Sequence, residues 1–176
     1  LEFCMRGCDV PIDVAFLGLA QTDQHGNVNV SKFSGRPVGC GGFINITQNA
    51  KKVVFCGTFS AGGLEVAVAD GRLRILREGR SSKFLDHVEQ ITFSGHYAAG
   101  IGQPVLYVTE RAVFRLTGEG IELLEVAPGI DIERDIVAHM AFPPLMRDVQ
   151  WMDAGIFQTQ WGRLGAIVAE HAQAGP

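Results

Sequence analysis

The sequence predicts an α/β fold, and three observations support this expectation. Nearly continuous apolar runs, of which residues 12–20 and 52–59 are the clearest, are typical of strands buried inside a sheet. A stretch with an acidic first turn and helical apolar spacing lies at residues 131–140. With 176 residues, 47% of them hydrophobic and 19% charged, the chain can bury one core, so we expect one domain or part of one.

The first predicted strand covers residues 12–20. It is apolar at almost every position, which predicts burial on both faces of a sheet. The polar residues 21–27, which include Gly26 and Asn27, predict a turn. Residues 28–32 then alternate between apolar and polar side chains, so we expect them to return as the second strand of a hairpin.

A glycine-rich loop follows at residues 35–43. Glycine allows backbone conformations and close approaches that other side chains block. We expect a short helix over residues 44–50 after the loop, and then the buried strand at 52–59. The loop therefore lies between two strands, where the sites of α/β proteins are often found.

The second half of the chain is rich in predicted strands. Asp70-Gly71 is a strong signal for a short hairpin, and we expect the neighbouring strands to form a meander that ends at Pro128-Gly129. The helix at 131–140 follows, and residues 142–176, with both tryptophans, show no clear pattern. The predicted strands are 64–68, 72–76, 88–93, 105–109, 112–116 and 121–126.

Charge and hydropathy exclude several classes of partner. The net charge of -4 argues against a nucleic-acid surface, because phosphate binding requires clustered lysine and arginine. The basic stretch 72–80 is interrupted by apolar residues, which favours a strand with a solvated face over a binding patch. No apolar run approaches the roughly 20 residues of a membrane span, and the N-terminus does not resemble a signal or transit peptide. We therefore expect a cytoplasmic protein with no nucleic-acid and no membrane partner.

The cysteines and histidines predict no metal site. The cysteines are too few and too irregularly spaced for a disulfide framework, and no CxxC pair is present, so we expect free thiols. His25, in the predicted turn, is interpreted as a polar turn residue rather than a substrate contact. The other histidines share no metal-ligand spacing. The residues concerned are Cys4, Cys8, Cys40, Cys56, His87, His96, His139 and His171.

The glycine loop and its surroundings resemble a known family. Family I coenzyme A transferases carry a Gly-x-Gly-Gly-(Ala/Phe) loop in their C-terminal half, and this chain has Gly39-Cys40-Gly41-Gly42-Phe43. The flanking sequence is also similar to that of the family, at residues 13–18, 25–29, 51–55, 109–114 and 122–130. The resemblance covers about residues 13–146 and is to enzymes of the acetate, propionate and 3-ketoacid type.

This resemblance implies a NagB/RpiA/CoA-transferase-like layered sheet, of which the chain holds the strand-rich C-terminal portion, truncated at its N-terminal side. We expect a divergent or artificial lead at 1–12, a partial C-terminal CoA-transferase domain at 13–146 and a tail at 147–176. The leucine at position 1 indicates that the chain was cut from something longer or carries such a lead. Truncation predicts an open sheet edge and an uncovered apolar face, and hence dimerisation, aggregation or docking with the missing half.

The family's chemistry implies the role of the loop. A glutamate carboxylate attacks the acyl-CoA thioester, forms an acyl-glutamyl anhydride and becomes a glutamyl-CoA thioester, which hands CoA to a free carboxylate. Backbone N–H groups of a glycine loop can stabilise, through hydrogen bonds, the oxyanion that forms at each attack. The resemblance thus implies that coenzyme A thioester is a substrate, that no cofactor is tightly bound, and that the thioester site is lined by Gly39, Cys40, Gly41, Gly42 and Phe43. Lys32 and Arg36 are candidates for the CoA phosphates, although solvated side chains are favoured.

The nucleophile itself is missing from the sequence. The family's Glu-x-Gly motif has no counterpart before Asp13, since Glu2 is followed by Phe3. Glu78 and Glu119 precede glycines but lie in predicted turns. We therefore expect no catalytic residue in this chain and no activity of the chain alone. We expect the missing N-terminal half to be its partner and the enzyme to be a homo-oligomer.

Three other functions remain open or are disfavoured. A non-catalytic, fold-completing or CoA-binding module is the main alternative, and an acyl-CoA hydrolase differs only in whether water replaces the acceptor acid. A sugar-phosphate isomerase of the related superfamily is disfavoured, because its acid and base residues have no counterpart in this sequence. The acyl groups exchanged are left open, since acceptor selectivity depends on the absent half.

Overall fold

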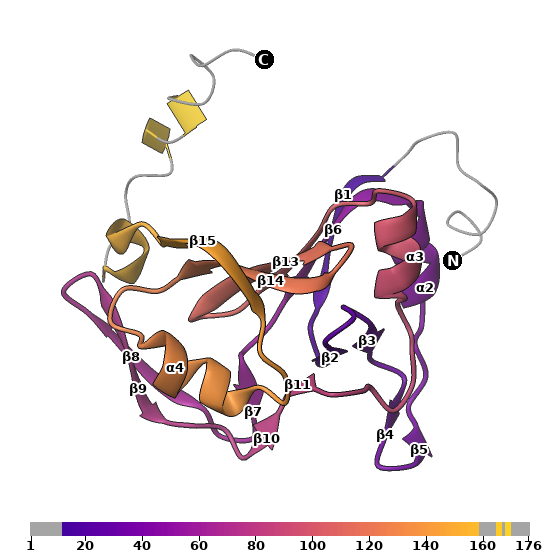
Figure 1. The fold of residues 1–176 in the computed structure, drawn as a ribbon, viewed down its shortest axis with the longest axis horizontal. Helices are drawn as coiled ribbons and strands as arrows, with labels where there is room; N and C mark the ends of the chain where they lie inside the picture. The colour runs from indigo at the N-terminus through magenta and orange to yellow at the C-terminus, as the bar shows by residue number, and fades with distance from the viewer. Residues whose placement is uncertain (1–11, 159–164, 167, 170–176) are drawn as a thin grey trace.

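The centre of the molecule is a six-stranded sheet in the order β1-β6-β12-β13-β14-β15 (Figure 1). The computed structural model describes residues 12–158, 165, 166, 168 and 169, so most of the expected lead, with Glu2, Cys4 and Cys8, and later Trp161 and His171, lie outside the described residues. The α/β expectation is confirmed. The sheet strands are β1 (Ile12–Gly18), β6 (Ala50–Cys56), β12 (Val105–Val108), β13 (Ala112–Thr117), β14 (Gly120–Val126) and β15 (Leu145–Trp151).

Strand direction divides this sheet into two parts. β1, β6 and β12 are parallel, whereas β12, β13 and β14 form the expected antiparallel meander. α2 (Phe43–Asn49) lies in the connection from β1 to β6, and α3 (Gly95–Gly100) in the connection from β6 to β12. The two helices are neighbours at the β1 and β6 end of the molecule (Figure 1).

Aromatic rings fill the core beneath these helices. The Phe55 ring of β6 stacks on the Phe43 ring of α2, with 5.7 Å between centroids, and meets the Phe93 ring edge-on at 5.1 Å. Tyr107 of β12 lies 5.5 Å from Phe55, and its hydroxyl donates a hydrogen bond to the Gly26 carbonyl at 2.6 Å. Parallel strands and their crossover helices therefore share one apolar layer on this face of the sheet.

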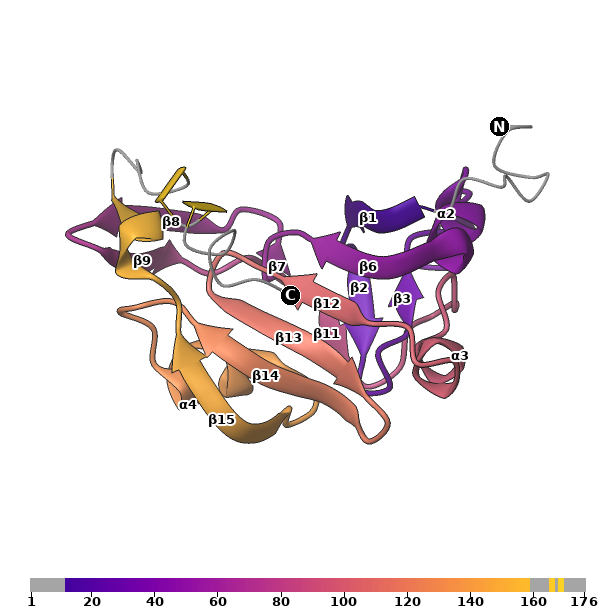
Figure 2. The ribbon, with the colours of Figure 1, turned by 90° about the horizontal axis from the view of Figure 1, so that it is seen from above.

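The prediction that the first strand is buried on both faces is wrong. β1 is the edge strand of the sheet among the described residues, and Figure 2 shows it outside β6. Val14 is 42% exposed and Phe16 is 73% exposed, whereas Ala15 between them is buried. An apolar run shows that side chains avoid water, but it does not show whether this chain provides the covering layer.

The predicted hairpin between residues 12–20 and 28–32 is also wrong, because β1 pairs with β6. The reversal occurs instead between β2 (Gln21–Asp23) and β3 (Val28–Asn29), which pair antiparallel in a small sheet of order β11-β2-β3. The Asp23 carboxylate fixes the turn by accepting the backbone N–H groups of His25 at 3.0 Å and Asn27 at 3.1 Å. An Asx-type turn of this kind outweighs the simple alternation of residue types.

The hairpin signal at Asp70-Gly71 is confirmed. β8 (Glu65–Ala69) pairs antiparallel with β9 (Arg72–Arg77), and both turn residues have positive φ, 54° and 71°. These strands form a two-stranded ribbon of their own rather than part of the meander, and in Figure 1 the ribbon lies far from the α2 and α3 end of the molecule.

The strand predicted at 88–93 is wrong. Only Phe93 forms a bridge, to Val28, and helix α3 begins two residues later with the Ser94 hydroxyl accepting the Tyr97 N–H at 3.2 Å. The remaining short strands are β4 (Lys32–Phe33), β5 (Arg36–Pro37), β7 (Ser60–Ala61), β10 (Ser81–Ser82) and β11 (Phe84–Leu85). None of the described helices is long and apolar enough to cross a membrane.

The predicted helix at 131–140 is present but divided. α4 (Ile132–Asp135) is capped by the Asp131 carboxylate, which accepts the Arg134 N–H at 2.8 Å, and a 3-10 turn, η1 (Val137–His139), follows. β15 then pairs parallel with β14 and carries the sheet to Trp151. A further 3-10 turn, η2 (Ala154–Phe157), contacts β9.

Candidate functional site

The glycine loop connects the small β4–β5 hairpin to the first turn of α2. Gly39 has φ of 82° and Gly41 has φ of 54°, a region in which side chains are strained, so these two positions require glycine for conformation alone. Gly42 caps α2 with an ordinary φ of -86°. The loop is largely exposed, and the buried Phe43 ring anchors its end in the core.

Three successive backbone donors of this loop are unpaired. Within the part of the chain that the structure describes, the N–H groups of Cys40, Gly41 and Gly42 donate to no acceptor. The next N–H group, that of Phe43, is already bonded to the Cys40 carbonyl at 3.0 Å, which closes the turn. Successive N–H groups in such a turn form a concave, electropositive site for an anionic oxygen.

The space in front of these donors is open. A Cβ atom at Gly39 or Gly41 would meet nothing within 4 Å, and one at Gly42 would touch only the Ile46 side chain at 3.5 Å, an ordinary contact. Neither the conformation of Gly42 nor the packing of this chain therefore demands a glycine there. A glycine at this position leaves room for a group from outside the described chain to approach the N–H donors.

A buried polar group holds the start of the loop. The Ser31 carbonyl accepts the N–H groups of Val38 at 2.8 Å and Gly39 at 3.3 Å. The Ser31 hydroxyl bonds to the Thr92 hydroxyl at 2.8 Å, and the Asn29 side-chain oxygen accepts the Ser31 N–H at 3.1 Å. Sequence reasoning missed these residues, because Ser31 and Thr92 lie 61 positions apart and no local signal links them.

The other residues weighed near the loop have different surroundings. The Cys40 thiol is half-buried and points to the Gly41 carbonyl at 3.8 Å. Lys32 lies 3.5 Å from the Glu89 carboxylate, while the exposed Arg36 guanidinium forms no ion pair with any of the described residues. The His25 ring stacks on that of His87, with 6.2 Å between the ring centroids. The described residues contain no cluster of three or more side chains that could hold a metal ion.

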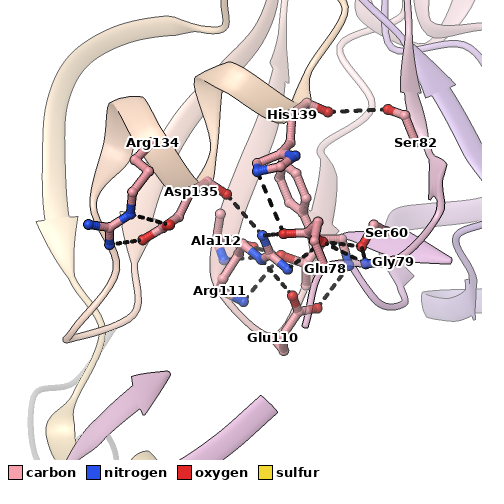
Figure 3. A network of polar contacts seen from close by, with 12 residues as sticks. Ser60, Glu78, Gly79, Ser82, Glu110, Arg111, Ala112, Arg134, Asp135 and His139 are labelled. Atoms are coloured by element: carbon pink, nitrogen blue, oxygen red, sulfur yellow. Dashed lines mark hydrogen bonds and ion pairs between the residues drawn. The ribbon is translucent and has the colours of Figure 1, made fainter. Parts of the chain in front are cut away.

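Glu78 belongs to a second polar cluster, shown in Figure 3. Both of its carboxylate oxygens accept hydrogen bonds from the fully buried Arg111 guanidinium, at 2.7 and 3.1 Å, and Ser60 donates a further one. Burial alone would raise the pKa of Glu78, but the hydrogen bonds from Arg111 and Ser60 hold it below its ordinary value. A carboxylate occupied in this way is a structural ion-pair partner. Glu119 instead forms an exposed pair with Arg147 at 2.6 Å.

The chain is similar in sequence to curated CoA-transferases. It is 52% identical over 165 residues to the caffeate CoA-transferase of Acetobacterium woodii. The aligned region covers 90% of this chain and 31% of that protein. The chain is 48% identical over 147 residues to the acetate CoA-transferase YdiF of Escherichia coli O157:H7, covering 83% and 28%. The chain thus spans about 30% of the length of these relatives, and no family model matches it.

Solved structures agree with the sequence matches. The acyl-CoA transferase YdiF of Escherichia coli O157:H7 superimposes with a TM-score of 0.84 as the apoenzyme and 0.85 as its thioester complex with CoA. Each is 45% identical and covers 91% of this chain and 31% of that one. Glutaconate CoA-transferase of Acidaminococcus fermentans, with a TM-score of 0.58 and 19% identity, shares the fold. The strand-rich fold, the glycine loop and these matches together show that the chain belongs to the family I coenzyme A transferases and corresponds to their C-terminal part.

Proposed function

We propose that this chain is the part of a CoA transferase that stabilises the oxyanion formed at the acyl-CoA thioester. The complete enzyme moves coenzyme A between an acyl-CoA and a free short-chain carboxylate. The observation that carries the proposal is the row of unpaired N–H groups at Cys40, Gly41 and Gly42, with open space in front of them. The names of the relatives, an acetate CoA-transferase and a caffeate CoA-transferase, support a free carboxylate as the acceptor, and the acetate enzyme supports a short-chain one.

The chemistry requires donors of this kind. When a glutamate carboxylate attacks the thioester carbonyl, a C–O bond forms and the carbonyl oxygen becomes an oxyanion. The C–S bond then breaks, CoA leaves as the thiolate, and its return to the acyl-glutamyl anhydride gives the glutamyl-CoA thioester and the free acid. Fixed N–H groups stabilise the oxyanion without reorganising, and one such donor contributes about 10²- to 10³-fold in kcat.

The nucleophile comes from the remainder of the enzyme. Among the described residues, neither glutamate that precedes a glycine is suited to attack, since Glu78 is neutralised by Arg111 and Glu119 pairs with Arg147 on the surface. The remaining two thirds of the enzyme is therefore the partner of this chain, and the substrates are an acyl-CoA and a carboxylate. We infer a homo-oligomeric enzyme of the cytoplasm, for which the free thiols of Cys40 and Cys56 are typical.

A transferase assay tests the division of labour. Acetyl-CoA serves as the donor and propionate or acetoacetate as the acceptor. The chain is assayed alone and with the portion of the Acetobacterium woodii relative that lies outside the matched 165 residues. Turnover only in the combined sample is the expected result. Turnover by the chain alone would show that it holds its own nucleophile.

Gly42→Ala tests the loop itself. The new methyl group fits the isolated chain, since it meets only Ile46 at 3.5 Å, but it occupies the approach to the N–H donors. We expect kcat of the combined enzyme to fall by about 10²-fold, with the thermal unfolding midpoint unchanged. Gly118→Ala is the matched control, because a Cβ there meets nothing within 4 Å and φ is not positive. Equal rates for the two variants would refute the role of the loop.

A further inference from the structure

The glycine loop has little rigidity of its own. Its glycines carry no side chain that restricts the backbone, and among the described residues the N–H groups of Cys40, Gly41 and Gly42 have no acceptor. Donors that stabilise an oxyanion act best when they are already fixed, because no free energy is then spent on orienting them during the reaction. The position of these donors therefore has to be set by contacts at the two ends of the loop.

The start of the loop is held through a pair of buried hydroxyl groups. The Ser31 carbonyl accepts the N–H of Gly39, the residue before the first unpaired donor, at 3.3 Å. The Ser31 hydroxyl in turn bonds to the Thr92 hydroxyl at 2.8 Å. Thr92 Oγ1 also accepts the Val30 N–H at 3.2 Å, so one side-chain oxygen fixes two consecutive residues of the segment that leads to the loop.

The end of the loop is held by the residue that follows Thr92. The Phe93 ring meets the Phe55 ring with 5.1 Å between centroids, and Phe55 stacks at 5.7 Å on Phe43, the last residue of the loop. All three rings are buried. The Thr92-Phe93 pair therefore restrains the start of the loop through a hydroxyl group and its end through aromatic packing.

The Thr92-Phe93 pair is itself fixed to β3. The Val28 carbonyl accepts the N–H groups of Thr92 at 2.9 Å and Phe93 at 3.0 Å, and the Phe93 carbonyl accepts the Val28 N–H at 3.0 Å. Val28 is fully buried. Three residues before Thr92, the Glu89 carboxylate accepts the Gly35 N–H at 2.7 Å and so contacts the turn between β4 and β5. The loop is thus referenced to the core by contacts that all lie within this chain.

We propose that Thr92 is a positioning residue for the N–H donors of the glycine loop. It acts through Ser31, whose carbonyl sets the position of Gly39 and hence of the donors that follow. Phe93 restrains the opposite end of the loop. This role rests on the proposed function, because the loop needs fixed donors only where an oxyanion forms.

Hydrogen exchange of the chain alone, followed by mass spectrometry, tests the restraint without any activity. Thr92→Val keeps the shape of the side chain and removes the hydroxyl, whereas Thr92→Ser keeps the hydroxyl. We expect the N–H groups of Val38 and Gly39, both bonded to the Ser31 carbonyl, to exchange roughly fivefold faster in Thr92→Val. In Thr92→Ser they should exchange at the rate of the unaltered chain.

Two further variants show whether the effect is specific. Ser31→Ala breaks the same hydroxyl pair from the other side and should also accelerate exchange at the start of the loop. Thr117→Val is the matched control, because it removes a hydroxyl that bonds to the Gly120 carbonyl at 2.9 Å in the β13–β14 turn. Unchanged exchange in Thr92→Val, or equal acceleration at the loop in Thr117→Val, would overturn the proposal.

Kinetics of the combined enzyme test whether the restraint serves the donors. The chain is mixed with the portion of the Acetobacterium woodii relative that lies outside the matched 165 residues. We expect Thr92→Val to lower kcat about tenfold and to leave KM for acetyl-CoA unchanged, because only the transition state uses the donors. Thr92→Ser should restore kcat, and Thr117→Val should leave it unchanged.

A double variant tests whether Thr92 acts through the loop. Gly42→Ala already blocks the approach to the donors, so adding Thr92→Val to it should lower kcat little further. Losses that multiply would show that Thr92 acts elsewhere and would overturn the proposal.

The measurements separate this proposal from the proposed function. Absence of turnover in the combined enzyme with the unaltered chain would refute the proposed function, while hydrogen exchange would still decide whether Thr92 restrains the loop. Turnover with the same kcat in Thr92→Val and the unaltered chain would leave the proposed function standing and overturn the positioning role of Thr92.

Discussion

At the scale of the residue, the buried Arg111 shows how a charge is kept inside this protein. Its side chain is 0% exposed, and its guanidinium donates to Glu78, to Glu110 at 2.7 Å and to the Asp135 carbonyl at 2.9 Å, above the Phe59 ring at 4.6 Å. Glu78 directly follows β9, Glu110 lies in the connection from β12 to β13, and Asp135 ends α4; Figure 3 shows their side chains around Arg111. Arg111 therefore connects three segments that are distant in sequence.

Removal of one carboxylate from this cluster should be costly. Glu78→Ala leaves the buried guanidinium with Glu110 as its only carboxylate partner, and we expect the free energy of unfolding to fall by about 3 kcal/mol. Glu65→Ala is the matched control, because it breaks an exposed pair with Arg77 and should cost less than about 1 kcal/mol. Urea unfolding of both variants measures the difference, and equal losses would contradict the structural role of Glu78.

The contribution of Glu78 should also depend on pH. Its pKa in the folded chain lies below the ordinary value of 4.5, because the hydrogen bonds from Arg111 and Ser60 outweigh burial, which by itself raises the pKa. The stabilisation is therefore fully present above that value and is lost as the pH falls through the lower pKa of the folded state. The gap in stability between the unaltered chain and Glu78→Ala should narrow in acid. A constant gap would exclude the ion pair as its cause.

At the scale of the element, the two ends of α3 make opposite demands on their glycines. A Cβ at Gly95 would overlap the His25 carbonyl oxygen and lie 2.7 Å from the Gly26 carbonyl carbon, so the helix start packs directly on the β2–β3 turn. A Cβ at Gly100 would meet nothing within 4 Å. Close packing therefore accounts for the first glycine and not for the second.

Alanine substitutions in α3 should separate these cases. We expect Gly95→Ala to destabilise the chain by about 3 kcal/mol, since backbone has to move to make room. Gly100→Ala should stabilise it by about 0.5 kcal/mol through the lower conformational entropy of the unfolded chain. Thermal unfolding of the two variants is the measurement, and a loss of stability in Gly100→Ala comparable to that in Gly95→Ala would show that the helix, rather than its contact with the turn, is sensitive.

Short elements were the hardest to predict from sequence. α3 spans only Gly95–Gly100, too few residues to show a helical period, and the segment before it, residues 88–93, was predicted to be a strand. β15 was missed because it is an edge strand whose side chains are mostly exposed, Trp151 among them. In both cases the element depends on a neighbour, which is the Gly26 turn for α3 and β14 for β15.

At the scale of the whole molecule, the exposed apolar face should make the isolated chain associate with itself. Val14 and Phe16 are exposed on β1, an edge strand among the described residues, and such edges and patches promote pairing between molecules. Light scattering at high protein concentration should show species larger than the monomer, and Phe16→Asp should reduce them. A monodisperse monomer of the unaltered chain at high concentration would contradict this expectation.

The sequence by itself determined the features that depend on neighbouring residues. The strands β6, β12, β13 and β14, the Asp70-Gly71 hairpin and the glycine loop before α2 all follow from local patterns of apolar, polar and turn residues. The Gly39-Cys40-Gly41-Gly42-Phe43 motif with its flanking segments was sufficient to indicate the family.

Only the tertiary structure decided which of these features meet. It placed β1 at an edge, turned the Phe43 ring into the core and left the N–H groups of Cys40, Gly41 and Gly42 without acceptors. The physical reason is distance along the chain: the hydrogen bonds that hold the loop and Arg111 join residues 61 and 33 positions apart. Burial, pairing and free donors are properties of such contacts, and a local pattern of residue types does not contain them.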